Sequence, residues 1–184
     1  MIYEFCAENV TLLEKAMRAG ARRIELCDNL AVGGTTPSYG VTKAAVELAA
    51  NYDTTIMTMI RPRGGDFDYN DLEIDIMLED IRLTAQAGSQ GVVFGALTAD
   101  KKLDKPNLEK LIAASKGMEI VFHMAFDELS DEDQLEAIDW LSQAGVTRIL
   151  TRAGVSGDPL EERFAHYHRI LEHAKGKIEI LPGG

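Results

Sequence analysis

The chain has 184 residues, 46% of them hydrophobic and 27% charged, which is typical of a globular protein of about one domain. A formal net charge of −11 argues against nucleic acid and acidic membrane surfaces as partners, because both attract clustered Lys and Arg. No apolar run approaches the ~18 residues of a membrane span. The sequence begins with a strand-like run rather than a leader peptide, so we expect a cytoplasmic protein whose two cysteines are thiols.

Short apolar runs and segments with helical periodicity alternate along the whole chain. The runs that we expect to be strands are residues 2–6, 23–27, 55–60, 91–94, 119–122, 148–150 and 177–181. A helix between each pair of strands favours parallel pairing through βαβ crossovers. In one such helix Ile74, Met77 and Ile81 share a face, and Ser130 with Asp133 marks the start of another.

The clearest helical spacing lies near the end of the chain. Apolar side chains recur on one face of the predicted helix, at Leu160, Phe164, Tyr167, Leu171 and Ala174. Asp158 is the expected N-cap, and Pro159 is the expected first helical residue. We expect the three histidines of this helix to be solvated surface residues: His166, His168 and His173.

A weak internal repeat supports a barrel. The dipeptides Ala19-Gly20, Ala87-Gly88 and Ala144-Gly145 each come a few residues before a predicted strand, where glycine can end a helix. The repeat predicts an α/β fold of the TIM-type (β/α)8 barrel class, C-terminally incomplete with about seven strands, in a single domain over residues 1–184. A doubly wound open sheet is the alternative, although no glycine fingerprint follows the first strand.

In such barrels the reactive side chains follow the carboxyl ends of the strands. Glu25 and Arg61 have this position on neighbouring predicted strands, either as a structural ion pair or as part of a substrate clamp. In the second interpretation, Arg61 and Arg63 bind a carboxylate or phosphate together with the loop glycines Gly33, Gly34, Gly183 and Gly184. Glu25, Arg61 and His123 are then the candidate catalytic residues.

Two cysteines occupy equivalent places on adjacent predicted strands. Cys6 and Cys27 each end a Glu-apolar-Cys tripeptide, and their sulfurs can meet if both side chains face inward. A pair of soft thiolates would prefer Cu(I) or Zn(II) to hard ions, whereas the simpler alternative is two small buried hydrophobes. His123 is a candidate third ligand or general base, or else a hydrogen-bonded core histidine.

The residues at the strand ends resemble those of the CutC family. The similarity is carried by the segments Arg23-Ile24-Glu25-Leu26-Cys27, Gly33-Gly34-Thr35-Thr36-Pro37-Ser38, Met59-Ile60-Arg61-Pro62-Arg63-Gly64-Gly65-Asp66-Phe67, Phe122-His123-Met124-Ala125-Phe126-Asp127, Ile149-Leu150-Thr151 and Leu181-Pro182-Gly183-Gly184. The resemblance implies a TIM-type barrel and a role in copper homeostasis, with Cys6 and Cys27 as Cu(I) ligands. Met124 stands where the family often has Arg, and Arg152-Ala153-Gly154 replaces a Ser-Gly-Gly type of turn.

Two classes of function are therefore expected. The first is a cytosolic copper-binding protein that buffers or passes Cu(I) through Cys6 and Cys27. The second is a barrel enzyme that acts on a small anionic substrate without a metal. Homodimer formation is also left open.

Overall fold

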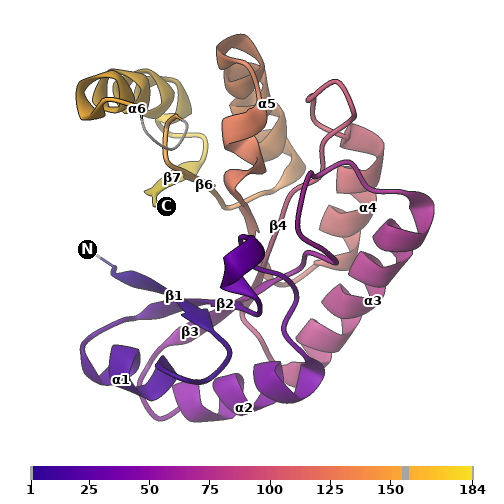
Figure 1. Ribbon diagram of the computed structural model, residues 1–184, viewed down its shortest axis with the longest axis vertical. Coiled ribbons are helices and arrows are strands. Elements are labelled where there is room, and N and C mark those ends of the chain that lie inside the picture. Colours follow the sequence, from indigo (N-terminus) through magenta and orange to yellow (C-terminus); the bar gives the residue numbers. More distant parts are fainter. Residues whose placement is uncertain (1, 155–157, 184) are drawn as a thin grey trace. The chain divides into compact units, whose positions relative to one another are not determined.

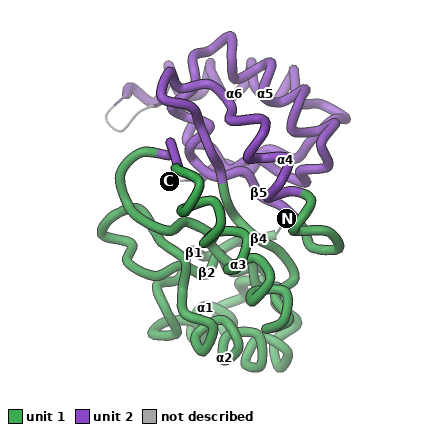
Figure 2. The backbone as a smooth tube through the Cα atoms, turned by 90° about the vertical axis from the view of Figure 1, so that its right-hand side faces the viewer, with its two compact units in different colours: residues 1–66, 70–94, 113–119 green, residues 67–69, 95–112, 120–184 purple. Residues whose placement is uncertain are grey.

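A computed structural model describes residues 2–154 and 158–183 of the chain. Strands and helices alternate in it from β1 to β7, as Figure 1 shows. The chain divides into two compact units, which Figure 2 colours separately. Unit 1 comprises residues 1–66, 70–94 and 113–119, and unit 2 comprises residues 67–69, 95–112 and 120–184. Among the described residues, no helix has both the length and the apolar character that crossing a membrane requires.

Unit 1 is built from parallel strands joined by helices. In chain order its elements are β1 (Glu4–Glu8), α1 (Leu13–Arg18), β2 (Arg23–Cys27), the short 3-10 turn η1 (Leu30–Val32), α2 (Tyr39–Ala49), β3 (Thr55–Met59), α3 (Asp71–Ala87) and β4 (Gly91–Phe94). Each strand pairs in parallel with the next one, as the intervening helices predict. The first strand lies two residues later than the predicted range 2–6.

Side chains alternate between the two faces of this sheet. Ile24 and Leu26 of β2 pack with Leu13 and Met17 of α1 in the core of unit 1. The intervening residues of β2, Arg23, Glu25 and Cys27, therefore point to the opposite face. All of β2 is buried, so this opposite face places polar groups away from water.

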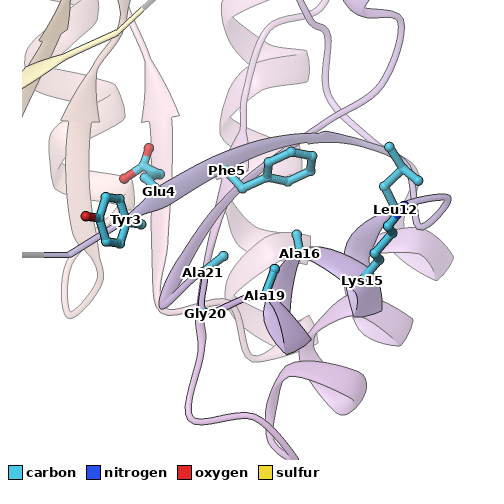
Figure 3. Close-up of a pocket in the computed structure, with 9 residues that line it drawn as sticks. All are labelled: Tyr3, Glu4, Phe5, Leu12, Lys15, Ala16, Ala19, Gly20 and Ala21. Carbon is cyan, nitrogen blue, oxygen red and sulfur yellow. The ribbon is translucent and has the colours of Figure 1, made fainter.

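An apolar pocket of about 360 Å³ lies on the helix side of β1. Figure 3 shows the Phe5 ring in this pocket, together with Leu12 and Ala16 from the chain around α1. Cys6 follows Phe5 in the strand, so its side chain points to the other face. The Cys6 side chain therefore does not line this pocket.

Unit 2 continues the same alternation. Its elements are α4 (Lys105–Ala114), β5 (Glu119–Phe122), the 3-10 turn η2 (Met124–Glu128), α5 (Asp131–Ala144), β6 (Arg148–Thr151), α6 (Leu160–Ala174) and β7 (Glu179–Pro182). The last two residues of α4 and the first residue of β5 belong to unit 1. β5, β6 and β7 are parallel neighbours, and α5 packs beside α6 (Figure 1).

The predicted helix boundaries are confirmed where capping residues define them. Ser130 caps α5, and its hydroxyl accepts a hydrogen bond from the Asp133 N–H at 3.2 Å. Gly88 and Gly145 end α3 and α5 in the left-handed conformation, with φ of 88° and 92°. These glycines are two of the three in the repeat that predicted the barrel.

The last helix, α6, differs from its prediction. It begins at Leu160 with Pro159 as the cap residue, so Asp158 is not the N-cap. Its buried residues are Ile170 and Ala174, whereas much of the predicted apolar face is exposed: Leu160 by 65%, Phe164 by 62% and Leu171 by 46%. We call these three residues the α6 apolar stripe. Of the predicted apolar face, Ala174 is buried, whereas these three residues are exposed in the structure.

Candidate metal site

The register of β1 and β2 brings three potential metal ligands together. Cys6 is opposite Glu25 in the parallel ladder, and Cys27 lies two residues further along β2 on the same face. The two Sγ atoms are 4.0 Å apart. Among the described residues, the group with metal-ligand spacing consists of Cys6, Glu25 and Cys27, with one donor atom from each within 4.8 Å of the others.

The three ligands differ in exposure. Cys27 is 1% exposed and Glu25 is 7% exposed, so both lie inside unit 1. Cys6 is exposed, and both cysteines are thiols. An ion or a reagent in solution can therefore reach the site through Cys6, while the other two donors are shielded from water.

The electrostatics of the site favour a thiolate at Cys6. The thiol of Cys27 donates a hydrogen bond to Cys6, and this is the largest of the causes that lower the Cys6 pKa to about 7. A hydrogen bond from Glu25 acts in the same direction, whereas burial and the charge of Glu4 act against it. The Cys27 pKa is raised, because its proton is held in that bond and because the group is buried.

The setting of Glu25 disfavours the ionised form of its carboxyl. Burial raises the pKa of its carboxyl well above the usual value, and a negative charge at Cys6 adds to the effect. The hydrogen bond between the Glu25 carboxyl and Cys6 lowers the Cys6 pKa and so favours the thiolate. Its Oε1 atom is buried and has no hydrogen-bond partner among the described residues. That oxygen is available as a ligand.

Arg61 organises the loops that follow β2 and β3. Its Nη1 donates to the carbonyl oxygens of Val32 at 2.9 Å and Gly34 at 3.0 Å, and its Nη2 donates to that of Gly65 at 2.7 Å. A Cβ on Gly33 would lie 3.1 Å from Nη1, so glycine leaves room for the guanidinium. Arg61 therefore holds two loops together, while its predicted pairing with Glu25 stays a prediction.

Arg63 makes a separate network at the surface. Its Nε donates to Glu73 at 2.5 Å, and its Nη2 forms an ion pair with Asp66 at 2.9 Å. The predicted anion site of Arg61, Arg63, Gly33 and Gly34 stays a prediction, as does the enzyme function built on it.

Two other predicted site residues lie in unit 2. His123 is buried, and its Nδ1 accepts a hydrogen bond from the Ala125 N–H at 3.2 Å. Its ring packs on Phe67 with centroids 4.8 Å apart, and a Cβ on Gly95 would lie 2.7 Å from it. Gly183 donates its N–H to the Thr151 carbonyl at 3.0 Å, and Gly184 lies outside the described residues. The roles predicted for these residues in catalysis and anion binding stay predictions.

Sequence reasoning did not assign Glu25 to the cysteine pair. The equivalent Glu-apolar-Cys tripeptides suggested that each cysteine faces its counterpart, but the strands are offset so that Cys6 faces Glu25. Because side chains alternate along a strand, Glu25 and Cys27 had to lie on the same face of β2. This alternation was the sequence signal that could have assigned Glu25 to the site. The offset depends on how the α1 segment between the strands packs and could not be predicted from the tripeptides alone.

The fold and this cysteine–carboxyl cluster define a class: an α/β protein of the TIM-barrel type with a site suited to a soft metal ion. The model of the CutC family matches residues 1–184, and the chain belongs to that family. The predicted fold class is confirmed by a solved structure that shares only the fold, the aldolase QR15, with 15% identity and a TM-score of 0.68 over 98% of this chain and 77% of that one.

Relatives with known names are considerably closer. A CutC family protein of Enterococcus faecalis is 52% identical over 184 residues, which is 100% of this chain and 88% of the relative. A human protein named copper homeostasis protein cutC homolog is 42% identical over 100% of this chain, which spans 64% of the human protein. The crystal structure of a copper homeostasis protein CutC from Streptococcus agalactiae has 46% identity and a TM-score of 0.96, over 100% of this chain and 88% of the other.

Proposed function

We propose that this chain is a cytoplasmic copper-homeostasis protein that binds Cu(I) through Cys6 and Cys27, with Glu25 as the third donor. The observation that carries the proposal is the approach of the two sulfurs to 4.0 Å beside a buried carboxyl oxygen that lacks a hydrogen-bond partner among the described residues. The names of the relatives support copper as the ion.

The donor set favours Cu(I) over other common ions. Two thiolates select soft ions such as Cu(I) and Zn(II) over Mg²⁺ or Ca²⁺. With metal–sulfur bonds of about 2.3 Å, sulfurs 4.0 Å apart give an S–metal–S angle of about 120°, which suits three donors in a plane. Structural zinc sites take four protein ligands, so the cluster of three donors does not match a structural zinc site.

The exposure of one ligand suits an ion that is taken up and passed on. Cys6 can exchange its metal with a soluble thiol carrier, because its sulfur is reachable while Cys27 and Glu25 hold the ion from within. Cytoplasmic location follows from the same chemistry, since the pair must stay reduced to bind Cu(I).

The test is an anaerobic Cu(I) titration against a chromophoric competitor such as bicinchoninate, under reducing conditions. We expect one Cu(I) per chain for the wild type, loss of stoichiometric binding in Cys27→Ser and weaker binding in Glu25→Gln. Met17→Leu serves as the control, because Met17 is a buried thioether that packs with Ile24 and Leu26, on the face of β2 opposite to the cluster. One tightly bound Cu(I) in a variant that lacks both cysteines, or none in the wild type, would overturn the proposal.

A further inference from the structure

Unit 2 contains a polar cavity that the copper site does not use. It has a volume of about 290 Å³ and lies at the carboxyl end of β6, between η2 and the first turns of α5 and α6. Its walls carry four carboxylates and one guanidinium, besides an imidazole and the Gln134 amide. All its lining residues belong to unit 2, so an inference about it does not depend on the copper proposal.

A buried amide fixes the tautomer of the imidazole. Gln134 is 4% exposed, and its Nε2 donates to the carbonyl oxygens of Phe126 at 3.2 Å and Leu129 at 3.4 Å. Its Oε1 is therefore an acceptor, and it lies 2.7 Å from Nε2 of His166. In its neutral form the His166 ring carries its proton on Nε2, which leaves Nδ1 as an acceptor that lies 3.8 Å from Oδ2 of Asp131. His166 is thus an oriented side chain, not the solvated surface residue that we expected.

A second acceptor in the cavity is the carboxylate of Asp127. It accepts a hydrogen bond from the Thr151 hydroxyl, and another from the Arg152 N–H at 3.1 Å. Both donors are neutral groups, and among the described residues Asp127 has no ion-pair partner within 4.0 Å. Partial burial raises the pKa of the Asp127 carboxyl, and the hydrogen bonds from Thr151 and Arg152 and the charges of Arg152 and His166 offset this rise only in part.

The charge of the walls selects a cation. Arg163 is the guanidinium of the lining, and its Nε is occupied by the Arg152 carbonyl oxygen at 3.0 Å. Of the carboxylates, Asp131 is paired with Arg169 at 3.0 Å, whereas Glu162 is exposed at the rim. Among the described residues, the group of three donors with metal-ligand spacing lies in unit 1, and this cavity does not gather such a group.

We propose that this cavity binds a small organic molecule carrying a protonated primary amine. The ammonium group donates to the Asp127 carboxylate and to Nδ1 of His166, which are fixed in place by Thr151 and Gln134. Glu162 adds charge attraction at the entrance. The volume of about 290 Å³ limits the ligand to the size of a short diamine or an amino alcohol.

The experiment follows the histidine ring signals of the ¹⁵N-labelled protein by NMR in about 150 mM NaCl. The probe is 1,4-diaminobutane, and 1,4-butanediol is the neutral control of the same length. We expect the diamine to move the His166 signals in a saturable way while those of His168, which is exposed on the same helix, stay in place. The diol should move neither.

Matched variants distinguish specific binding in the cavity from non-specific electrostatic attraction of the diamine to an acidic protein. Glu162→Gln should weaken diamine binding about threefold to tenfold, whereas Glu161→Gln, the same change at an exposed neighbour outside the cavity, should leave it unchanged. Asp127→Asn, checked for folding by its melting temperature, should lose binding. Equal effects of the two glutamate changes, non-saturable shifts, or the same saturable shift with Mg²⁺ would each overturn the proposal.

Discussion

At the scale of single residues, the site combines three acids, of which one has a lowered pKa and two have raised pKa values. At neutral pH the Cys6 thiol, with its pKa lowered to about 7, is about half ionised, whereas the raised pKa values of Cys27 and Glu25 favour their protonated forms. The same two protons that stabilise the Cys6 thiolate must leave when a metal replaces them. Metal binding and proton release are therefore coupled.

This coupling predicts how the number of released protons depends on pH. Below about pH 7 the Cys6 thiol is also protonated, so each Cu(I) should displace one more proton than it does above pH 7. The affinity for Cu(I) should accordingly fall more steeply with decreasing pH below 7 than above it. Calorimetric titrations in buffers of different ionisation enthalpy measure the released protons directly. A constant number between pH 6 and about pH 8.5 would contradict a Cys6 pKa near 7.

Glu25 also predicts a pH-dependent stability difference. Its folded-state pKa is raised above 4.5, so its contribution to stability is fully present below pH 4.5 and is lost as the pH rises through the folded-state value. Glu25→Gln removes this loss. Relative to the wild type, the free energy of unfolding of the variant should rise by up to about 1.4 kcal/mol for each pH unit above 4.5, until the pH reaches the folded-state pKa of Glu25. Urea denaturation at pH 4.5 and about pH 7.5 measures the gap, which should be near zero at the lower pH. The same gap at both values would show that Glu25 is ionised in the folded protein.

At the scale of elements, the sequence predicted what depends on local chemistry. The parallel strands, the Ser130 cap and the helix-ending Gly88 and Gly145 all follow from side-chain periodicity or from a backbone conformation that one residue type prefers. The offset of β1 against β2 was not predicted, because it depends on how the α1 segment packs. The loop contacts of Arg61 were missed for a similar reason, since they involve carbonyl groups whose positions no side-chain pattern encodes.

The turn after β4 shows such a non-local requirement. Gly95 approaches His123 so closely that a Cβ would lie 2.7 Å from the ring. Gly95→Ala should therefore lower the free energy of unfolding by about 1–3 kcal/mol, because the buried ring must shift. Gly40→Ala is the matched control, since the nearest atom would be 3.9 Å away and Ala is the better helix former within α2. Chemical denaturation measures the free energy of unfolding of both variants. An unchanged value for Gly95→Ala would mean that the His123 ring can shift without loss of stability.

At the scale of the whole molecule, two features of the surface act in opposite directions. The net charge of −11 makes copies of the chain repel one another. The α6 apolar stripe exposes Leu160, Phe164 and Leu171 to water, which favours contact with another apolar surface. Repulsion between charges is weakened by salt, whereas the attraction between apolar groups is not.

The α6 apolar stripe therefore gives the protein an unusual dependence on ionic strength. Most contacts between charged proteins loosen as salt is added, but here self-association should grow between about 20 mM and about 500 mM NaCl, where the Debye length falls several-fold. Sedimentation velocity should show a larger weight-average mass at the higher salt concentration, and Phe164→Gln should reduce the increase. Leu72→Gln changes an equally exposed residue of α3 and should not. A concentrated salt solution and a dilute buffer would then hold this protein in different states of assembly.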